Sequence, residues 1–163
     1  MPPVLNLLLP ETPATAVEDM VNRMKDSDGS ERVAPIRKEL QETMDMNAQV
    51  YRNDETLNQA LSDVRALKER YKNVSIHDKG KRYNTDLLEA IELGFLLELA
   101  EVLVVSALAR TETRGGHARE DYQTRDDKQF MKHTMAYADE KVGVRLDYKP
   151  VVMTRYEPME RKY

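Results

Sequence analysis

Apolar side chains recur every three or four residues along much of this chain, which is the spacing of one face of an α-helix. The repeats predict a short amphipathic helix over residues 14–25 and longer helices over residues 35–52, 53–71 and 86–111. Four prolines within the first thirteen residues indicate that residues 1–13 form an extended linker, which lacks the basic start and cleavage site of a secretory signal.

Several residues at the predicted boundaries suit helix ends. Pro35 fits the first turn of its helix, Asn53 or Asp54 can cap the next one, and Asn84 or Thr85 can cap the last.

The last of these helices is apolar nearly all round. Its acidic residues fall at scattered angles, so no single side suits water. We therefore expect this helix at the centre of a bundle, surrounded on most sides by other helices or by another domain. Four glutamates within residues 87–109 would each be costly in lipid, so this stretch does not predict a direct membrane span.

The helical pattern ends after Arg110. Residues 119–128 are almost entirely charged or polar, and partial alternation over residues 130–137 and 141–148 predicts a β-hairpin, followed by an extended tail over residues 156–163. The predicted fold is therefore mainly α. It is a three-helix bundle of the spectrin-repeat-like, up-down-up kind, with a C-terminal segment of loops and a short β-hairpin.

A chain of 163 residues is long enough for one domain with its own core. We expect residues 1–31 to form the linker and short helix, and residues 32–112 to form the helical bundle. Residues 113–163 would then form the charged loop, the hairpin and the extended C-terminal tail.

Composition excludes several kinds of site. The chain has no cysteine, so it holds no disulfide, thiolate zinc site or cysteine-bound iron–sulfur cluster. Its net charge of -4 argues against nucleic acid as a partner. It contains no glycine-rich dinucleotide or phosphate motif, so we assign no cofactor-binding residue.

Candidate catalytic and metal-binding residues are also sparse. His77, His117 and His133 lie far apart in the sequence and lack the spacing of metal ligands. Glu98 and Glu101, on successive helical turns, are the remaining candidates for acid–base work, but ion pairs or a hydrogen-bond network between helices explain them more simply. We therefore assign no catalytic or metal-binding residue in this chain.

The segment from Arg114 to Tyr122 is the most distinctive one. Gly115 and Gly116 allow the backbone to approach another group closely, and four ionisable side chains follow them. By residue type alone this segment is either a solvated turn or a docking loop, and the two interpretations weigh equally.

Residues 112–122, Glu-Thr-Arg-Gly-Gly-His-Ala-Arg-Glu-Asp-Tyr, resemble the Glu-Ser-Arg-Gly-x-His-x-Arg-x-Asp motif of succinate dehydrogenase and fumarate reductase flavoprotein subunits. L-Aspartate oxidase shares a looser form. The similarity covers about residues 32–163, with Thr113 in place of the usual serine and Gln123 in place of the usual proline. The other similar segments are a helix that ends in Arg52, Asn-Thr-Asp-Leu from Asn84, Met-Lys-His-Thr from Met131, Lys-Pro-Val from Lys149 and the terminal Arg-Lys-Tyr from Arg161.

The resemblance implies a C-terminal helical domain that packs on the FAD-binding domain of an enzyme oxidising succinate to fumarate. In such an enzyme electrons pass through FAD to an iron–sulfur subunit and quinone, in a cytoplasmic complex held peripherally at the cytoplasmic membrane. The family's flavin-binding and substrate-binding residues lie upstream of the part present here. FAD is therefore expected in the full-length subunit and none on this chain, and no catalysis is expected from this chain alone.

The resemblance also implies a role for the charged segment as a docking loop, whose charges pair across an interface with the FAD-binding domain. The residues assigned to this loop are Arg114, Gly115, Gly116, His117, Arg119, Glu120 and Asp121. Without that domain, the charged groups are expected to be hydrated, and an apolar face including residues 102–108 is expected to be exposed. The alternative function is a stand-alone scaffold or regulatory interaction protein that reuses the same helical domain.

Overall fold

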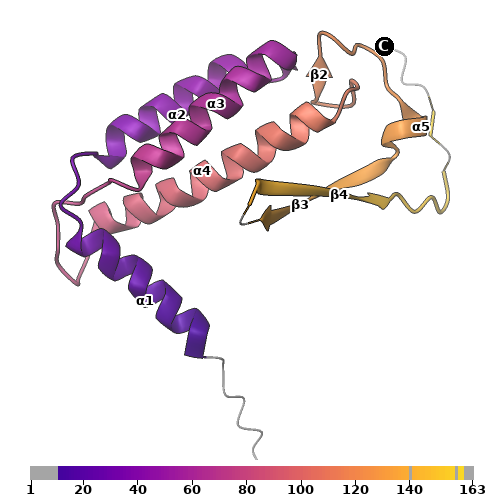
Figure 1. Cartoon of the computed structure of the whole chain (residues 1–163). Coiled ribbons are helices and arrows are strands. Elements are labelled where there is room, and N and C mark those ends of the chain that lie inside the picture. The colour runs from indigo at the N-terminus through magenta and orange to yellow at the C-terminus, as the bar shows by residue number, and fades with distance from the viewer. Residues whose placement is uncertain (1–10, 140, 157, 160–163) are drawn as a thin grey trace, which may run out of the picture. The chain divides into compact units, whose positions relative to one another are not determined.

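The computed structural model describes residues 11–139, 141–156, 158 and 159, with side chains from residue 15 onward (Figure 1). The helices of this part are α1 (Glu11–Asp26), α2 (Val33–Asn47), α3 (Asp54–Tyr71), α4 (Thr85–Ala109) and α5 (Asp127–Phe130). The strands are β1 (Tyr51–Arg52), β2 (Ala118–Arg119), β3 (Lys132–Asp139) and β4 (Gly143–Pro150). The predicted mainly α class with a C-terminal hairpin is confirmed.

Two helix boundaries differ from the predicted ones. α1 begins at Glu11, so Pro13 lies in the first turn, where its missing N–H leaves no intrahelical hydrogen bond unmade. The rest of the predicted linker, residues 1–10, lies outside the described residues. α2 ends at Asn47 because Tyr51 and Arg52 form β1 and pair in parallel with β2, a partner far along the chain that no local pattern indicates.

The starts of α3 and α4 agree with the predicted caps. The Thr56 N–H donates to Asn53 Oδ1 over 2.9 Å, and the Leu87 N–H donates to Asn84 Oδ1 over 2.8 Å. Each asparagine thus satisfies a backbone donor that the first turn of its helix leaves free. Of the two candidate caps for each helix, the asparagine is the one used.

The chain forms two compact units. The first combines the described residues up to Glu42 with residues 65–98, and the second combines residues 43–64 with the described residues from Leu99 onward. α2, α3 and α4 each contribute residues to both units.

In the first unit, the segments of α2, α3 and α4 enclose a core of aliphatic side chains. Ile36, Leu93 and Leu97 are almost completely buried. Ion pairs connect these helices at the surface, and they join Arg37 to Glu92 at 3.6 Å, Arg70 to Glu39 at 2.5 Å and Lys68 to Glu98 at 2.9 Å. Exposed pairs each add less than about 1 kcal/mol, so the buried leucine and isoleucine side chains hold this unit together.

Gly94 allows α3 and α4 to approach closely within the first unit. The Tyr71 hydroxyl donates to the Ala90 carbonyl over 2.7 Å, and a Cβ at position 94 would lie 2.6 Å from the same hydroxyl oxygen. A glycine inside a helix costs about 1 kcal/mol relative to alanine. Here it makes room for the tyrosine ring.

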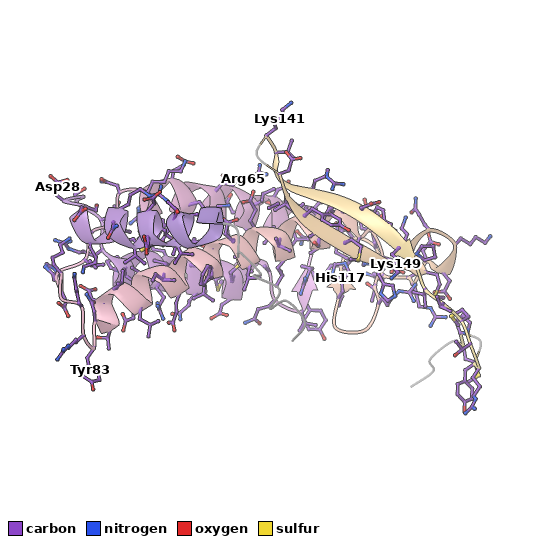
Figure 2. The ribbon with its side chains drawn as sticks, turned by 90° about the horizontal axis from the view of Figure 1, so that it is seen from below. Asp28, Arg65, Tyr83, His117, Lys141 and Lys149 are labelled. Atoms are coloured by element: carbon purple, nitrogen blue, oxygen red, sulfur yellow. The ribbon has the colours of Figure 1, made fainter. Side chains whose placement is uncertain are left out.

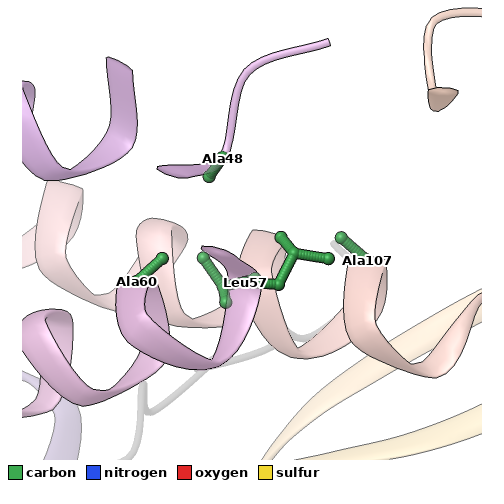
Figure 3. Packing of buried hydrophobic residues seen from close by; sticks show 5 residues of the cluster. Ala48, Leu57, Ala60 and Ala107 are labelled. Atoms are coloured by element: carbon green, nitrogen blue, oxygen red, sulfur yellow. The ribbon is translucent and has the colours of Figure 1, made fainter. Parts of the chain in front are cut away.

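In the second unit, small and branched side chains of α3 and α4, together with Ala48 just after α2, form the core (Figure 3). Leu57 of α3 is fully buried and points toward Ala107 of α4, with Ala60 beside it. Glu101 of α4 is also buried, and its Oε1 would lie 3.0 Å from a Cβ at Gly143 of the hairpin. The absence of a side chain at position 143 therefore leaves room for this carboxylate.

β3 and β4 form the predicted hairpin in the second unit, paired antiparallel from Lys132 and Pro150 to Asp139 and Gly143. Gly143 takes a positive φ of 79° at the turn, which favours glycine. Val144 on one face is buried, whereas Met135 and Tyr137 on the other face are exposed. The alternation that predicted the hairpin reflects these two different faces.

The helices of the described part do not enclose α4 on all sides, and the apolar face expected to be exposed without another domain is present on it. Leu88, Phe95 and Leu99 are 54%, 59% and 64% exposed, and Leu96 and Leu103 are also exposed. Positions seven and four residues apart lie on one side of a helix, so these side chains form an apolar row on α4. Within the described residues much of this row is exposed, and it overlaps the predicted residues 102–108 at Leu103 and extends from there back along α4 to Leu88. None of the helices in the described part has the length and apolarity to cross a bilayer.

Two neighbouring leucines of α4 provide a test of this division into buried and exposed sides. We expect Leu97→Ala to lower the free energy of unfolding by about 2 to 4 kcal/mol, because it leaves a cavity at a site that is 1% exposed. Leu96→Ala, the control at a side chain 43% exposed, should cost less than about 1 kcal/mol. Urea unfolding followed by circular dichroism measures both, and equal losses would contradict the orientation of α4.

Candidate functional site

The charged segment after α4 is held as a compact loop. Arg114 and His117 close a tight turn through two backbone hydrogen bonds of 2.9 and 3.1 Å. Gly115 lies within it at a positive φ of 60°, which explains the need for glycine. No atom beyond the neighbouring residues lies within 4 Å of a Cβ built at Gly115 or Gly116, so within the described residues these glycines face open space.

Strands β1 and β2 attach this loop to the start of α3. The Ala118 N–H donates to the Val50 carbonyl over 3.2 Å, and the Glu120 N–H donates to the Arg52 carbonyl over 2.9 Å. These bonds bring Arg52 next to Arg119 and Glu120, which lie far from it in the sequence.

Glu112 is the first of two buried charged groups that organise the loop. Its carboxylate accepts hydrogen bonds from Arg110 at 2.6 Å, from Arg114 at 2.7 and 3.0 Å, and from the Asp126 N–H at 2.8 Å. Burial by itself would raise the pKa of Glu112, but the donors from Arg114, Asp126 and Arg110 hold that pKa below its usual value. The carboxylate is therefore ionised and fully paired.

Arg119 is the second buried group, and its side chain is 0% exposed. Its guanidinium donates two hydrogen bonds of 2.7 Å to Asp121, another to Asp54, and two to the carbonyls of Ala107 and Leu108 at 3.1 and 3.5 Å. Asp54 begins α3 and the two carbonyls belong to the last turn of α4. Arg119 therefore joins the start of one helix to the end of another.

His117 contacts the end of α4 as well. Because a carbonyl can only accept, the Nε2–H of His117 donates to the Arg110 carbonyl, over 2.9 Å. Burial lowers the pKa of His117, and the positive charges of Arg52, Arg119 and Arg110 lower it further, while the hydrogen bond opposes them. The imidazole is therefore neutral near pH 7.

An open pocket of about 560 Å³ lies between the loop and the base of the hairpin in the second unit. Figure 2 shows the labelled His117 beside the hairpin strands. The pocket also brings together His117 and His133, which are distant in the sequence. The residues that line the pocket are Arg52, Leu103, Ser106, Ala107, Arg110, Arg114, His117, Phe130, Met131, Lys132, His133, Thr134 and Val151.

The seven residues assigned to the docking loop have three different environments. Arg114 and His117 line the pocket, and Gly115, Gly116 and Glu120 are exposed. Arg119 is buried and bonded to Asp121, so the expectation that these groups are hydrated is wrong for Arg119. The same burial shows that this loop is not solvated along its whole length.

Sequence reasoning missed several residues that build this site. Glu112 and Arg110 were given no role, and Asp54 only that of a possible helix cap, although Glu112 pairs with Arg110 and Arg114, and Asp54 pairs with the buried Arg119. Arg52 was noticed only as the end of a helix. The alternating Arg110, Glu112 and Arg114 provide a local signal for the first ion pair, whereas the pairing of Arg119 with Asp54 has none.

Removal of the Arg119 guanidinium tests its structural role. We expect Arg119→Met to lower the free energy of unfolding by about 3 kcal/mol, because it leaves two carboxylates and the α4 carbonyls without their donor. Arg125→Met is the matched control, since Arg125 pairs with Asp127 at 2.8 Å near the surface, and should cost less than about 1 kcal/mol. Chemical denaturation that gave the two variants equal stability would contradict the role of Arg119.

The ion pair between Arg119 and Asp121 should also shape the acid sensitivity of the fold. The hydrogen bonds from Arg119 lower the pKa of Asp121 from 3.8 to about 2. Because the folded-state value lies below the unfolded one, the pair stabilises the fold fully above the unfolded value and is lost as pH falls toward about 2. The stability difference between wild type and Arg119→Met should therefore shrink between about pH 5 and about pH 2.5. Urea titrations at the two pH values measure it, and a constant difference would count against this ion pair.

Comparison with known proteins shows which family the chain resembles. The sequence pattern described as fumarate reductase flavoprotein C-term matches residues 37–163. The succinate dehydrogenase flavoprotein subunit of Rickettsia bellii is 43% identical over 142 residues, which are 85% of this chain and 24% of that protein. A chain in the solved structure of Escherichia coli quinol fumarate reductase has a TM-score of 0.87 and 39% identity, over 92% of this chain and 26% of the other.

A more distant likeness concerns the fold alone. Adenylylsulfate reductase from Archaeoglobus fulgidus has a TM-score of 0.75 at 21% identity, over 92% of this chain and 26% of that one. The chain spans about a quarter of the length of the curated relatives it matches. By its sequence pattern and its close relatives, this chain belongs to the family of C-terminal domains of succinate dehydrogenase and fumarate reductase flavoprotein subunits.

Proposed function

We propose that this chain serves as the C-terminal domain of an enzyme that interconverts succinate and fumarate, and that it docks against the flavin-binding portion of the same subunit. Its own contribution is packing and interface formation, with the redox chemistry located in the rest of the subunit. Family membership supports the enzyme class, because the relatives are named succinate dehydrogenase and fumarate reductase flavoprotein subunits.

The observation that carries the docking proposal is the exposed apolar row on α4. Leucine and phenylalanine side chains along one helix side are normally buried, and a contiguous exposed row is typical of an interaction surface. Burial of Phe95 and Leu99 alone would remove a large apolar area from water. Because the relatives are about four times longer than this chain, the remainder of such a subunit is the natural partner for the row.

The docking loop supplies a second contact in this proposal. Gly115, Gly116 and Glu120 are exposed, so they can contact a partner without disturbing the buried Arg119. In a complete enzyme this surface would face the flavin-binding portion or an iron–sulfur subunit, and any attachment to a cytoplasmic membrane would come through other subunits.

The residues of this chain do not fit FAD itself. The Gly115–Gly116 turn is closed by its own backbone hydrogen bonds and does not open directly into a helix, so it lacks the helix N-terminus that holds a dinucleotide pyrophosphate. We therefore place FAD in the rest of the subunit and derive no reaction step from these residues.

Binding to a flavin-binding partner tests the proposal. The partner is the Rickettsia bellii succinate dehydrogenase flavoprotein subunit shortened by the part that this chain matches, loaded with FAD. We expect calorimetry to show binding by wild type, and binding at least about tenfold weaker by Leu99→Glu/Leu103→Glu, because two carboxylates would enter an apolar interface.

Val17→Glu is the control, since Val17 is 56% exposed on α1 and lies outside the row. It should bind as wild type does. If Leu99→Glu/Leu103→Glu also bound normally, α4 would not be the docking surface. Absence of binding by wild type would contradict the proposed function and favour a stand-alone scaffold or regulatory protein.

A further inference from the structure

The pocket beside the docking loop has an unusual distribution of charge. Six of its lining residues carry basic or imidazole groups, and no aspartate or glutamate of the described residues lines it. Two of the six are already neutralised, because Arg110 and Arg114 both pair with the buried Glu112. The question is therefore what balances the others.

Arg52 and Lys132 have no ion pair with any carboxylate of the described residues. Arg52 is half-buried, and its Nε donates to the Gln49 carbonyl over 2.5 Å, which leaves its two terminal amino groups for another acceptor. Lys132 Nζ lies 3.8 Å from the centre of the Tyr148 ring and 5.6 Å from that of Phe130. Ring faces favour a cation near them but leave its hydrogen-bond donors without a charged acceptor.

Apolar side chains form the other part of the lining. Leu103 and Ala107 come from α4, Phe130 ends α5, and Met131 and Val151 lie directly beside the two strands at the base of the hairpin. A pocket of about 560 Å³ is within the range of small-molecule sites, which are mostly apolar with a few polar groups that fix orientation. A small hydrated anion would leave this apolar surface without a partner.

We propose that this pocket binds an organic anion, with its carboxylate on Arg52 and Lys132 and its apolar body on the side chains of α4 and the hairpin base. The arginine offers two parallel donors, which match the two oxygens of a carboxylate. Partial burial strengthens this contact relative to water, since the local dielectric is lower. The apolar wall selects anions with an aromatic or branched aliphatic group.

The test uses benzoate as the probe, followed by amide chemical shifts of the purified whole chain in NMR. Benzoate should give saturable shifts at Leu103, Ala107 and Met131, with a dissociation constant on the order of millimolar for so small a ligand. Acetate and succinate lack the apolar body, and benzyl alcohol lacks the charge, so each should bind at least about tenfold more weakly.

Variants show whether the two cations act as proposed. Arg52→Gln and Lys132→Gln should each weaken benzoate binding by at least about fivefold, and the second variant covers the case in which the first disturbs β1. Lys81→Gln, in an exposed loop of the first unit, should leave binding unchanged. Unsaturable shifts, binding of inorganic phosphate as tight as that of benzoate, or unchanged binding by both pocket variants would overturn the proposal.

A competition experiment identifies the source of the carboxylate, and this part alone rests on the proposed function. If the flavin-binding partner forms a complex and displaces benzoate, an acidic side chain of the partner occupies the pocket. If the complex forms and benzoate stays bound, the occupant is a free organic anion. Absence of a complex would count against the proposed function, while the titration of the free chain would still decide the pocket.

Discussion

The buried guanidinium of Arg119 is the interaction on which the arrangement of the second unit depends. A fully buried arginine is stable only when its charge and all its donors are matched, and here Asp121, Asp54 and two α4 carbonyls provide the match. The carbonyls at a helix C-terminus lack intrahelical donors and carry partial negative charge, so a cation suits them. The position of the charged loop therefore follows from the ends of two helices rather than from the loop itself.

Two kinds of charged group thus lie at or near the charged loop. Glu112 and Arg119 are buried, and their charges are paired inside the fold. Each hydrogen-bonds several partners and so makes the loop compact. Arg52 and Lys132 remain without a carboxylate among the described residues, although they lie close to the same loop. An arginine-rich sequence therefore does not by itself indicate how much charge is available for a partner. The exposed row on α4 is an apolar surface that shares Leu103 with the pocket, so recognition by this domain combines two different physical contributions.

Proteins that are named for different reactions share the fold of this domain. The close relatives are succinate dehydrogenase and fumarate reductase flavoprotein subunits, whereas an adenylylsulfate reductase has the same fold at 21% identity. A shared helical domain does not determine a substrate, because reactions depend on the residues of a site. For this chain the informative features are therefore its exposed row, its loop and its pocket.

The sequence alone determined the helices, two candidate caps each for α3 and α4, the hairpin and the family, because these depend on local periodicity, on residues near helix ends and on a contiguous motif. For Glu98 it favoured an ion pair or hydrogen-bond network between helices over acid–base work, and Glu98 does form an ion pair with Lys68 of another helix. Only the tertiary structure decided that α2 stops before Tyr51, that Arg119 bonds Asp54, and that His117 and His133 share one pocket with Arg52. Each of these joins residues distant in the chain, and such contacts depend on how helices pack, which no local pattern encodes.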